Sequence, residues 1–81
     1  MTIKILCFGS LKEAAGFSSI EINHQPGQNV SAVFDHVFKN HEKYAVCKAD
    51  ILYAVNQQHV PPNTPVHDGD EVALMPPLAG G

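Results

Sequence analysis

The last six residues are the segment of this sequence best suited to chemistry, because they end in two glycines. A residue without a side chain can enter a narrow channel and adopt backbone angles that other residues avoid. The four residues after Pro77 reach at most about 13–14 Å when extended. The prolines favour an extended base, which reduces the entropy lost when the tail docks, and the leucine offers an apolar anchor. We therefore expect a tail that enters a pocket of another protein, made of Pro76, Pro77, Leu78, Ala79, Gly80 and Gly81.

The five histidines do not have the spacing of a metal site. His36 and His41 are five residues apart at a predicted helix, which splits them onto different faces, whereas ligands on one helical face need an i, i+4 spacing. His24, His59 and His67 fall in separate loops or strand ends. We expect surface histidines and no bound metal.

The two cysteines and one acidic turn are the remaining candidates. Cys7 falls on the apolar face of a predicted strand, where we expect it to be buried. Cys47 falls in a predicted loop without a basic cluster to lower its pKa, so we expect no nucleophilic role for it. Asp68, Asp70 and Glu71 lack the other ligands of a calcium loop and are interpreted as a solvated turn. With so few cysteines, a reducing cytoplasm is the expected compartment.

The size and charge of the chain argue against several classes of function. Its 81 residues predict one domain at 1–75, followed by the tail at 76–81. Such a small domain has little room for an enclosed active site. Five lysines, no arginine and eight carboxylates give a formal net charge of -3, which disfavours nucleic acid as a partner. The longest apolar runs are far too short to span a membrane.

Alternating apolar residues predict the strands that position the tail. Residues 2–8 and 19–23 alternate near the start of the chain, and residues 51–55 predict a third strand. Residues 59–60 are interpreted as a short continuation of the third strand, and residues 71–75 as the last strand. The core face of the first strand is expected to carry Ile3, Ile5 and Cys7.

Two helices are predicted between these strands. Residues 10–13 have the spacing of a capping box and Gly16 follows as a stop, which predicts a short helical turn. The second helix could be capped by Gln28 or Asn29 and is expected to end near residues 40–41. Its apolar stripe repeats with helical period and consists of Val30, Val33, Phe34, Val37 and Phe38.

The predicted order is strand, strand, helix, strand, short strand, strand. A helix that covers one face of a sheet defines an α+β fold. The last strand is expected to lie parallel to the first, because a helical crossover allows this pairing. This is the order of the ubiquitin-like β-grasp, a mixed sheet of about four to five strands on one main helix.

Specific motifs in this framework resemble one known family. The stretches are Ala54-Val55-Asn56-Gln57, Asp68-Gly69-Asp70-Glu71-Val72-Ala73 and the ending Pro76-Pro77-x-x-Gly80-Gly81, and the opening strand with Phe8, Lys12-Glu13 and Gly16 also fits. Together they resemble the MoaD family, the sulfur carriers that form the small subunit of molybdopterin synthase. The resemblance covers essentially the whole chain.

This resemblance implies a cycle of chemistry at Gly81. An ATP-dependent, MoeB-like adenylyltransferase would join the Gly81 carboxylate to AMP, and a persulfide donor would then displace AMP to leave a thiocarboxylate. The thiocarboxylate would transfer sulfur to a pterin precursor held by the large subunit. The chain itself would bind no cofactor, would catalyse nothing alone, and would assemble with the large subunit as a heterotetramer, two copies of each.

A docking surface should accompany such a tail. If Ile3 and Ile5 face the helix, Leu6 and Phe8 emerge on the opposite face of the sheet, joined by Met75 from the last strand. An exposed apolar patch of this kind marks a protein–protein site, and the alternative is that loops cover it. Lys12 is a candidate for a salt bridge to the partner.

Other functions share parts of this pattern. A carrier for thiamine or cysteine synthesis has a similar tail. A ubiquitin-like protein modifier also has its terminal carboxylate adenylated, but forms isopeptide bonds with lysines. A passive scaffold domain would tolerate loss of Gly81. Intact mass separates a sulfur carrier, which gains one sulfur in place of one oxygen, from a modifier, which appears as heavier conjugates.

Overall fold

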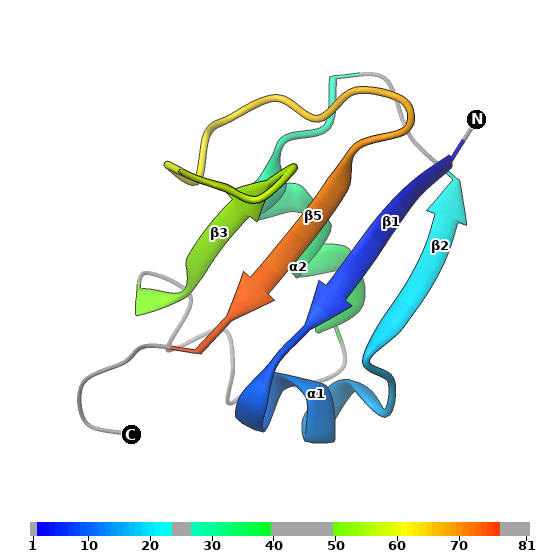
Figure 1. Ribbon diagram of the computed structural model, residues 1–81, viewed down its shortest axis with the longest axis vertical. Coiled ribbons are helices and arrows are strands. Elements are labelled where there is room, and N and C mark those ends of the chain that lie inside the picture. The colour runs from blue at the N-terminus through cyan, green and yellow to red at the C-terminus, as the bar shows by residue number, and fades with distance from the viewer. Residues whose placement is uncertain (1, 24–26, 40–49, 77–81) are drawn as a thin grey trace.

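The computed structural model describes residues 2–23, 27–39 and 50–76. Within these residues one mixed sheet has the strand order β2-β1-β5-β3-β4. The longer helix packs behind this sheet and the shorter helix lies at one end of it (Figure 1). The predicted α+β β-grasp is therefore confirmed. The elements in chain order are β1 (Thr2–Cys7), α1 (Gly9–Ala15), β2 (Ser19–Asn23), α2 (Val30–Val37), β3 (Leu52–Val55), β4 (Gln58–Val60) and β5 (Glu71–Met75).

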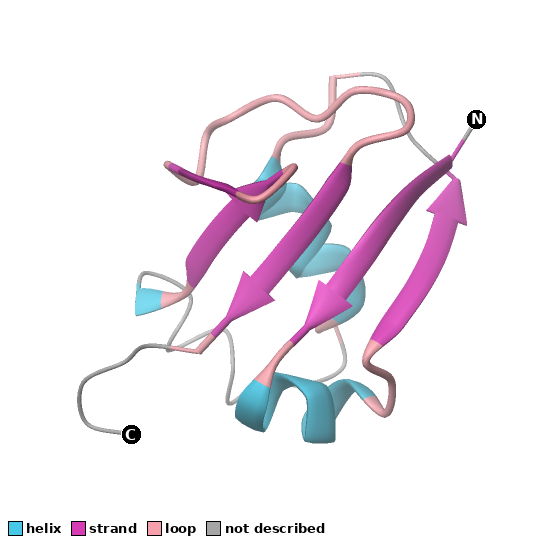
Figure 2. Ribbon diagram, in the orientation of Figure 1, coloured by secondary structure: helices cyan, strands magenta, loops and turns pink. Residues whose placement is uncertain are grey.

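The strand pairings agree with the predicted topology. β1 pairs antiparallel with β2, and β1 pairs parallel with β5, as predicted for the first and last strands. β5 also pairs antiparallel with β3. Figure 2 shows the consequence: β5 runs from the end of the sheet bordered by the β4–β5 loop to the end where α1 lies.

The core lies between the sheet and α2. Alternate residues of β1 point into it, so that Ile3, Ile5 and Cys7 are at most 1% exposed, as predicted. Phe34 of α2 lies at its centre, with its ring centroid 4.8 Å from that of Phe38 and 6.5 Å from that of Tyr53. Each large buried side chain contributes roughly 1.5–3 kcal/mol of hydrophobic stabilisation.

α2 begins at a side-chain cap and ends earlier than predicted. The Asn29 side chain accepts a hydrogen bond from the Ala32 amide at 2.8 Å, which confirms one of the two predicted caps. The helix ends at Val37, because Phe38 leaves the helical range at φ -109 and ψ 22. Residues 40–41, the predicted end, lie outside the described residues.

The predicted capping box at the start of α1 is wrong. The N-cap is Phe8, which is extended and makes no side-chain cap, so Ser10 lies inside the first turn. The Phe8 amide still belongs to the sheet, since it donates to the Leu74 carbonyl at 3.2 Å. The chain then turns at Gly9, with φ +56. The predicted stop is confirmed, because Gly16 ends α1 in the left-handed region.

β4 is a returning strand and not a continuation of β3. Asn56 and Gln57 both have positive φ, 51° and 72°, as the central residues of a tight hairpin turn require. The chain therefore reverses, and β4 pairs antiparallel with β3. The prediction that residues 59–60 continue the third strand is wrong for this reason.

Side chains tie this hairpin to the acidic turn before β5. Asn56 Nδ2 donates to Asp70 Oδ1 at 3.0 Å, and Asn56 Oδ1 accepts from the Glu71 amide at 3.0 Å. Asp70 Oδ2 accepts from the His67 amide at 2.8 Å. The predicted turn is present, and its carboxylate has a structural role at the end of the sheet where β5 begins.

This network predicts a difference between two neighbouring substitutions. Asn56→Ala removes both side-chain hydrogen bonds, whereas Gln57→Ala alters a residue with similar backbone geometry. We expect Asn56→Ala to lower the free energy of unfolding by about 1–2 kcal/mol more than Gln57→Ala, as measured by denaturant titration. Equal losses for the two variants would contradict the role assigned to Asn56.

Candidate functional site

The face of the sheet opposite α2, here called the outer face, carries an apolar patch. The strand register places Leu6 beside Ala73, and Ala73 beside Ala54. Met75 lies beside Leu52 in the next row. Phe8 follows Leu6 by two residues in an extended backbone, which directs its side chain to the same side. The outer patch consists of Leu6, Phe8, Leu52, Ala54, Ala73 and Met75.

This patch is accessible in the described part of the chain, where no helix crosses the outer face (Figure 1). Phe8 is 47% exposed, while Leu6 and Met75 are half-buried. The structure thus brings together three of the predicted docking residues. Sequence reasoning missed Leu52, Ala54 and Ala73. Leu52 and Ala73 each stand between two buried residues, which carried the signal, whereas Ala54 is itself buried, at 6% exposed.

Charged residues border the patch towards the end of the sheet where β5 begins. Lys4 of β1 lies opposite Glu21 of β2 and beside Glu71 of β5. One cation therefore stands between two carboxylates in a single row across the outer face. An apolar centre with a polar rim is the usual anatomy of a protein–protein interface.

Lys12, the fourth predicted docking residue, lies elsewhere. It is exposed on α1, at the end of the sheet, and not on the outer face. Its role in a salt bridge to a partner stays a prediction.

The root of the tail lies at the same end as Phe8. Because β1 and β5 are parallel, Cys7 is paired with Leu74 and both strands end together. Pro76 follows immediately, close to Gly9. The remaining predicted tail residues, namely Pro77, Leu78, Ala79, Gly80 and Gly81, the predicted reacting residue, lie outside the described residues.

Comparison with known proteins agrees with this architecture. The ThiS family model matches residues 5–81, which includes the tail. The chain belongs to the ThiS family. Among curated ThiS-like relatives, the Escherichia coli molybdopterin synthase sulfur carrier subunit is 36% identical over 81 residues, covering 98% of this chain and 99% of that protein. The predicted resemblance to such carriers is confirmed.

Several solved structures share this fold, and one of them is a complex of two subunits. The putative molybdopterin converting factor subunit 1 from Pyrococcus furiosus is 28% identical over 96% of this chain and 99% of its own, with a TM-score of 0.77. A chain of the complex of molybdopterin-converting factor subunits 1 and 2 from Helicobacter pylori is 24% identical over the full length of both chains, with a TM-score of 0.62. SAMP1 from Haloferax volcanii shares the fold at 20% identity, full coverage of both chains and a TM-score of 0.73.

The buried cysteine of this ThiS-family chain is unsuited to sulfur chemistry. Cys7 is 1% exposed, and desolvation by burial raises its pKa from the ordinary 9.0 to about 11. A nucleophilic or persulfide-bearing cysteine needs an accessible thiolate, which Cys7 does not provide. Cys47 lies outside the described residues.

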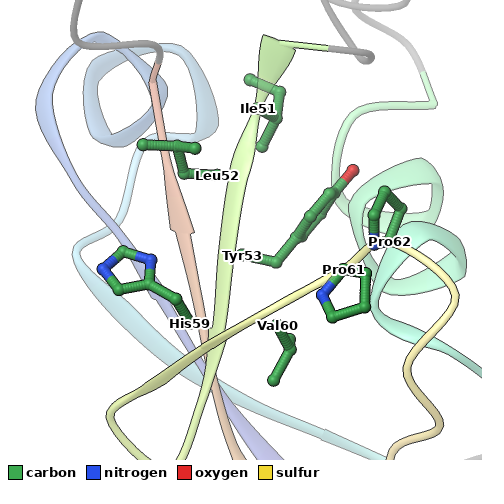
Figure 3. A pocket seen from close by; sticks show the side chains of 7 residues that line it. All are labelled: Ile51, Leu52, Tyr53, His59, Val60, Pro61 and Pro62. Atoms are coloured by element: carbon green, nitrogen blue, oxygen red, sulfur yellow. The ribbon is translucent and has the colours of Figure 1, made fainter.

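One apolar hollow of about 340 Å³ lies at the β3–β4 edge (Figure 3). In Figure 3 the Tyr53 ring points towards Pro62 and α2, whereas His59 lies on the other side of β3. Burial and the charge of Asp35 raise the Tyr53 pKa, against a lowering by Ser31, so the phenol stays protonated and is no base. The hollow is lined by Ile51, Leu52, Tyr53, His59, Val60, Pro61 and Pro62.

Two further features are absent from residues 2–23, 27–39 and 50–76. No group of His, Cys, Asp and Glu there could hold a metal ion. No helix there is long and apolar enough to cross a membrane. The outer patch and the neighbouring tail root are therefore the strongest candidate site on the described surface.

The burial of Cys7 predicts low reactivity and a distinct pH dependence. In a Cys47→Ser variant, we expect native Cys7 to resist iodoacetamide at pH 8 and to react once the chain is unfolded in denaturant. The folded state holds a thiol proton that the unfolded state releases above pH 9.0. The stability from Cys7 is therefore fully present below that pH and is lost as the pH rises towards about 11.

The control for the pH dependence of stability is Cys7→Ala in the Cys47→Ser variant, because it keeps every other titrating group. The stability of this control should fall less between pH 9.0 and about 11. Rapid alkylation of native Cys7 at pH 8 would show that the thiol is accessible, contrary to its position in the core.

Proposed function

We propose that this chain is a sulfur carrier for molybdopterin synthesis and that it carries the sulfur as a thiocarboxylate on Gly81. The main support is the full-length match to molybdopterin synthase sulfur carrier subunits, together with a family match that extends to residue 81. The fold adds a physical reason, because the tail begins beside an apolar patch on which a partner can dock.

The chemistry follows from the weakness of a carboxylate as an electrophile. A MoeB-like activating enzyme would transfer AMP from ATP to Gly81, with pyrophosphate as the leaving group. The terminal sulfur of a persulfide donor would then attack the acyl adenylate and displace AMP, which gives an acyl disulfide. A thiol would cleave the S–S bond of this acyl disulfide, forming a disulfide with the donor's sulfur and releasing the Gly81 thiocarboxylate. That soft anion would attack the cyclic pyranopterin precursor in the large subunit. The general acids and bases would belong to the partner proteins, since this chain supplies a single reactive group.

The outer patch would be the surface that the large subunit binds. The Helicobacter pylori structure is a complex of subunits 1 and 2 of the molybdopterin-converting factor, which supports a two-subunit assembly for this chain as well. A few residues near the centre of an interface supply most of its binding energy. We place the assembly, two copies of each subunit, in the cytoplasm.

Protein modification and other sulfur pathways are the competing functions. SAMP1, the small archaeal modifier protein 1 of Haloferax volcanii, shares only the fold with this chain, at 20% identity. The sequence match to the Escherichia coli carrier is higher, at 36%. This difference favours sulfur transfer for molybdopterin synthesis over conjugation.

The first prediction of this proposal concerns the mass of the chain end. After co-expression with an activating enzyme and a persulfide donor, the C-terminal peptide should gain the mass of one sulfur in place of one oxygen. Removal of Gly81 should abolish both the gain and sulfur transfer to the pterin precursor. Heavier conjugates with lysines, without a sulfur-bearing end, would instead identify a modifier.

The second prediction concerns docking. Phe8→Asp places a charge in the outer patch and should weaken binding to the large subunit about tenfold or more, measured by titration calorimetry, with the fold intact. Ile20→Asp is the matched control, because Ile20 is also exposed, at 40%, but lies on the edge strand β2. Equal affinities of the two variants would remove the outer patch from the docking surface.

A further inference from the structure

We propose that Gly9 is a positioning residue for the reacting end: its lack of a side chain leaves space for the Pro76 ring, and this contact sets the direction in which the tail leaves the sheet. This inference rests on the proposed function, because it concerns the delivery of Gly81 to a partner's active site. Gly9 is the first residue of α1, two residues after the end of β1, and lies far along the chain from the tail that it would direct.

The contact leaves no room for a larger residue. A Cβ on Gly9 would lie 3.0 Å from Pro76 Cγ and 3.6 Å from Pro76 Cδ. Carbon atoms in contact prefer separations of roughly 3.5–4.0 Å. One of the two residues would therefore have to move if Gly9 carried a side chain.

The backbone around Gly9 is held on both sides. The Phe8 amide donates to the Leu74 carbonyl at 3.2 Å, which ties the start of the turn to β5. The Phe8 carbonyl accepts from the amides of Leu11 and Lys12, at 3.1 and 3.3 Å, which ties it to the first turn of α1. Leu11 is fully buried and anchors that helix in the core. Pro76, next to the end of β5, is the partner that would yield.

A movement at Pro76 is amplified along the tail. Five residues follow it, and in extended form they span about 17 Å. A change of roughly 10° in the exit direction would then displace the far end by about 3 Å. Displacements of about 1 Å in a reacting group can lower a rate by orders of magnitude. The outer patch would remain unchanged, so the chain would still dock.

Gly16 supplies a control on the same helix. It also has a positive φ, +85, so a side chain there is strained in a similar way. A Cβ on Gly16 would meet nothing within 4 Å. The difference between equivalent substitutions at Gly9 and Gly16 therefore isolates the contact with Pro76 from general backbone strain.

The experiment measures the kinetics of adenylation with ATP and a MoeB-like activating enzyme, at a temperature where every variant is folded. Gly9→Ala should lower kcat a few-fold and Gly9→Leu about tenfold or more, with KM nearly unchanged, because the change is confined to the contact with Pro76 and misdirects the end without altering the rest of the surface. Gly16→Ala and Gly16→Leu should keep the wild-type kcat. A double-mutant cycle adds Pro76→Ala, which removes the ring carbons, and the effect of Gly9→Ala should shrink in that background.

Each outcome has a distinct meaning. If the wild-type chain is adenylated and the Gly9 and Gly16 variants behave alike, the positioning role is wrong and the proposed function stands. A change confined to KM, or an effect of Gly9→Ala that is independent of Pro76, also overturns the positioning role. If the wild-type chain is not adenylated at all, both the proposed function and this inference fail.

Discussion

The parallel pairing of β1 with β5 decides where the tail leaves the molecule. Parallel strands end at the same edge of a sheet, so the last residue of β5 lies beside the end of β1 and the start of α1. An antiparallel arrangement would send the tail to the opposite end, away from Phe8. The pairing thus places the outer patch and the root of the tail at the same end of the sheet, where the proposed docking and the proposed chemistry at Gly81 would act together.

Two of the motifs that carry the family resemblance, those around Asn56 and Asp70, lie at a distance from the tail. Asn56 and Asp70 hold the β3–β4 hairpin against the turn before β5, at the end of the sheet opposite the tail root (Figure 2). They fix the position from which β5 begins and hence its register with β1. Their value for the function is therefore indirect, since they build the strand whose other end releases the tail.

Much of the fold could be predicted because it follows from local periodicity. The alternation of Ile3, Ile5 and Cys7 and the helical stripe of α2 each report one buried face. The hairpin at Asn56 and Gln57 was missed because the usual glycine of such turns is absent, and the positive φ values come from the tertiary setting. Ser10 had the spacing of a cap, but the β5 pairing holds Phe8 extended and starts α1 at Gly9.

The candidate site was predictable in part for the same reason. Leu6, Phe8 and Met75 could be placed on the outer face because successive residues of a strand point to opposite faces of the sheet. The contact of Gly9 with Pro76 joins distant segments of the chain and has no local signal in the sequence.

The central claim is that the outer patch and the tail root form one binding surface. Amide chemical shifts of the labelled chain, titrated with the large subunit, test it most directly. The account predicts large changes along β1, β5 and residue 76 and small ones on the solvent side of α2, whereas changes centred on α2 would contradict it.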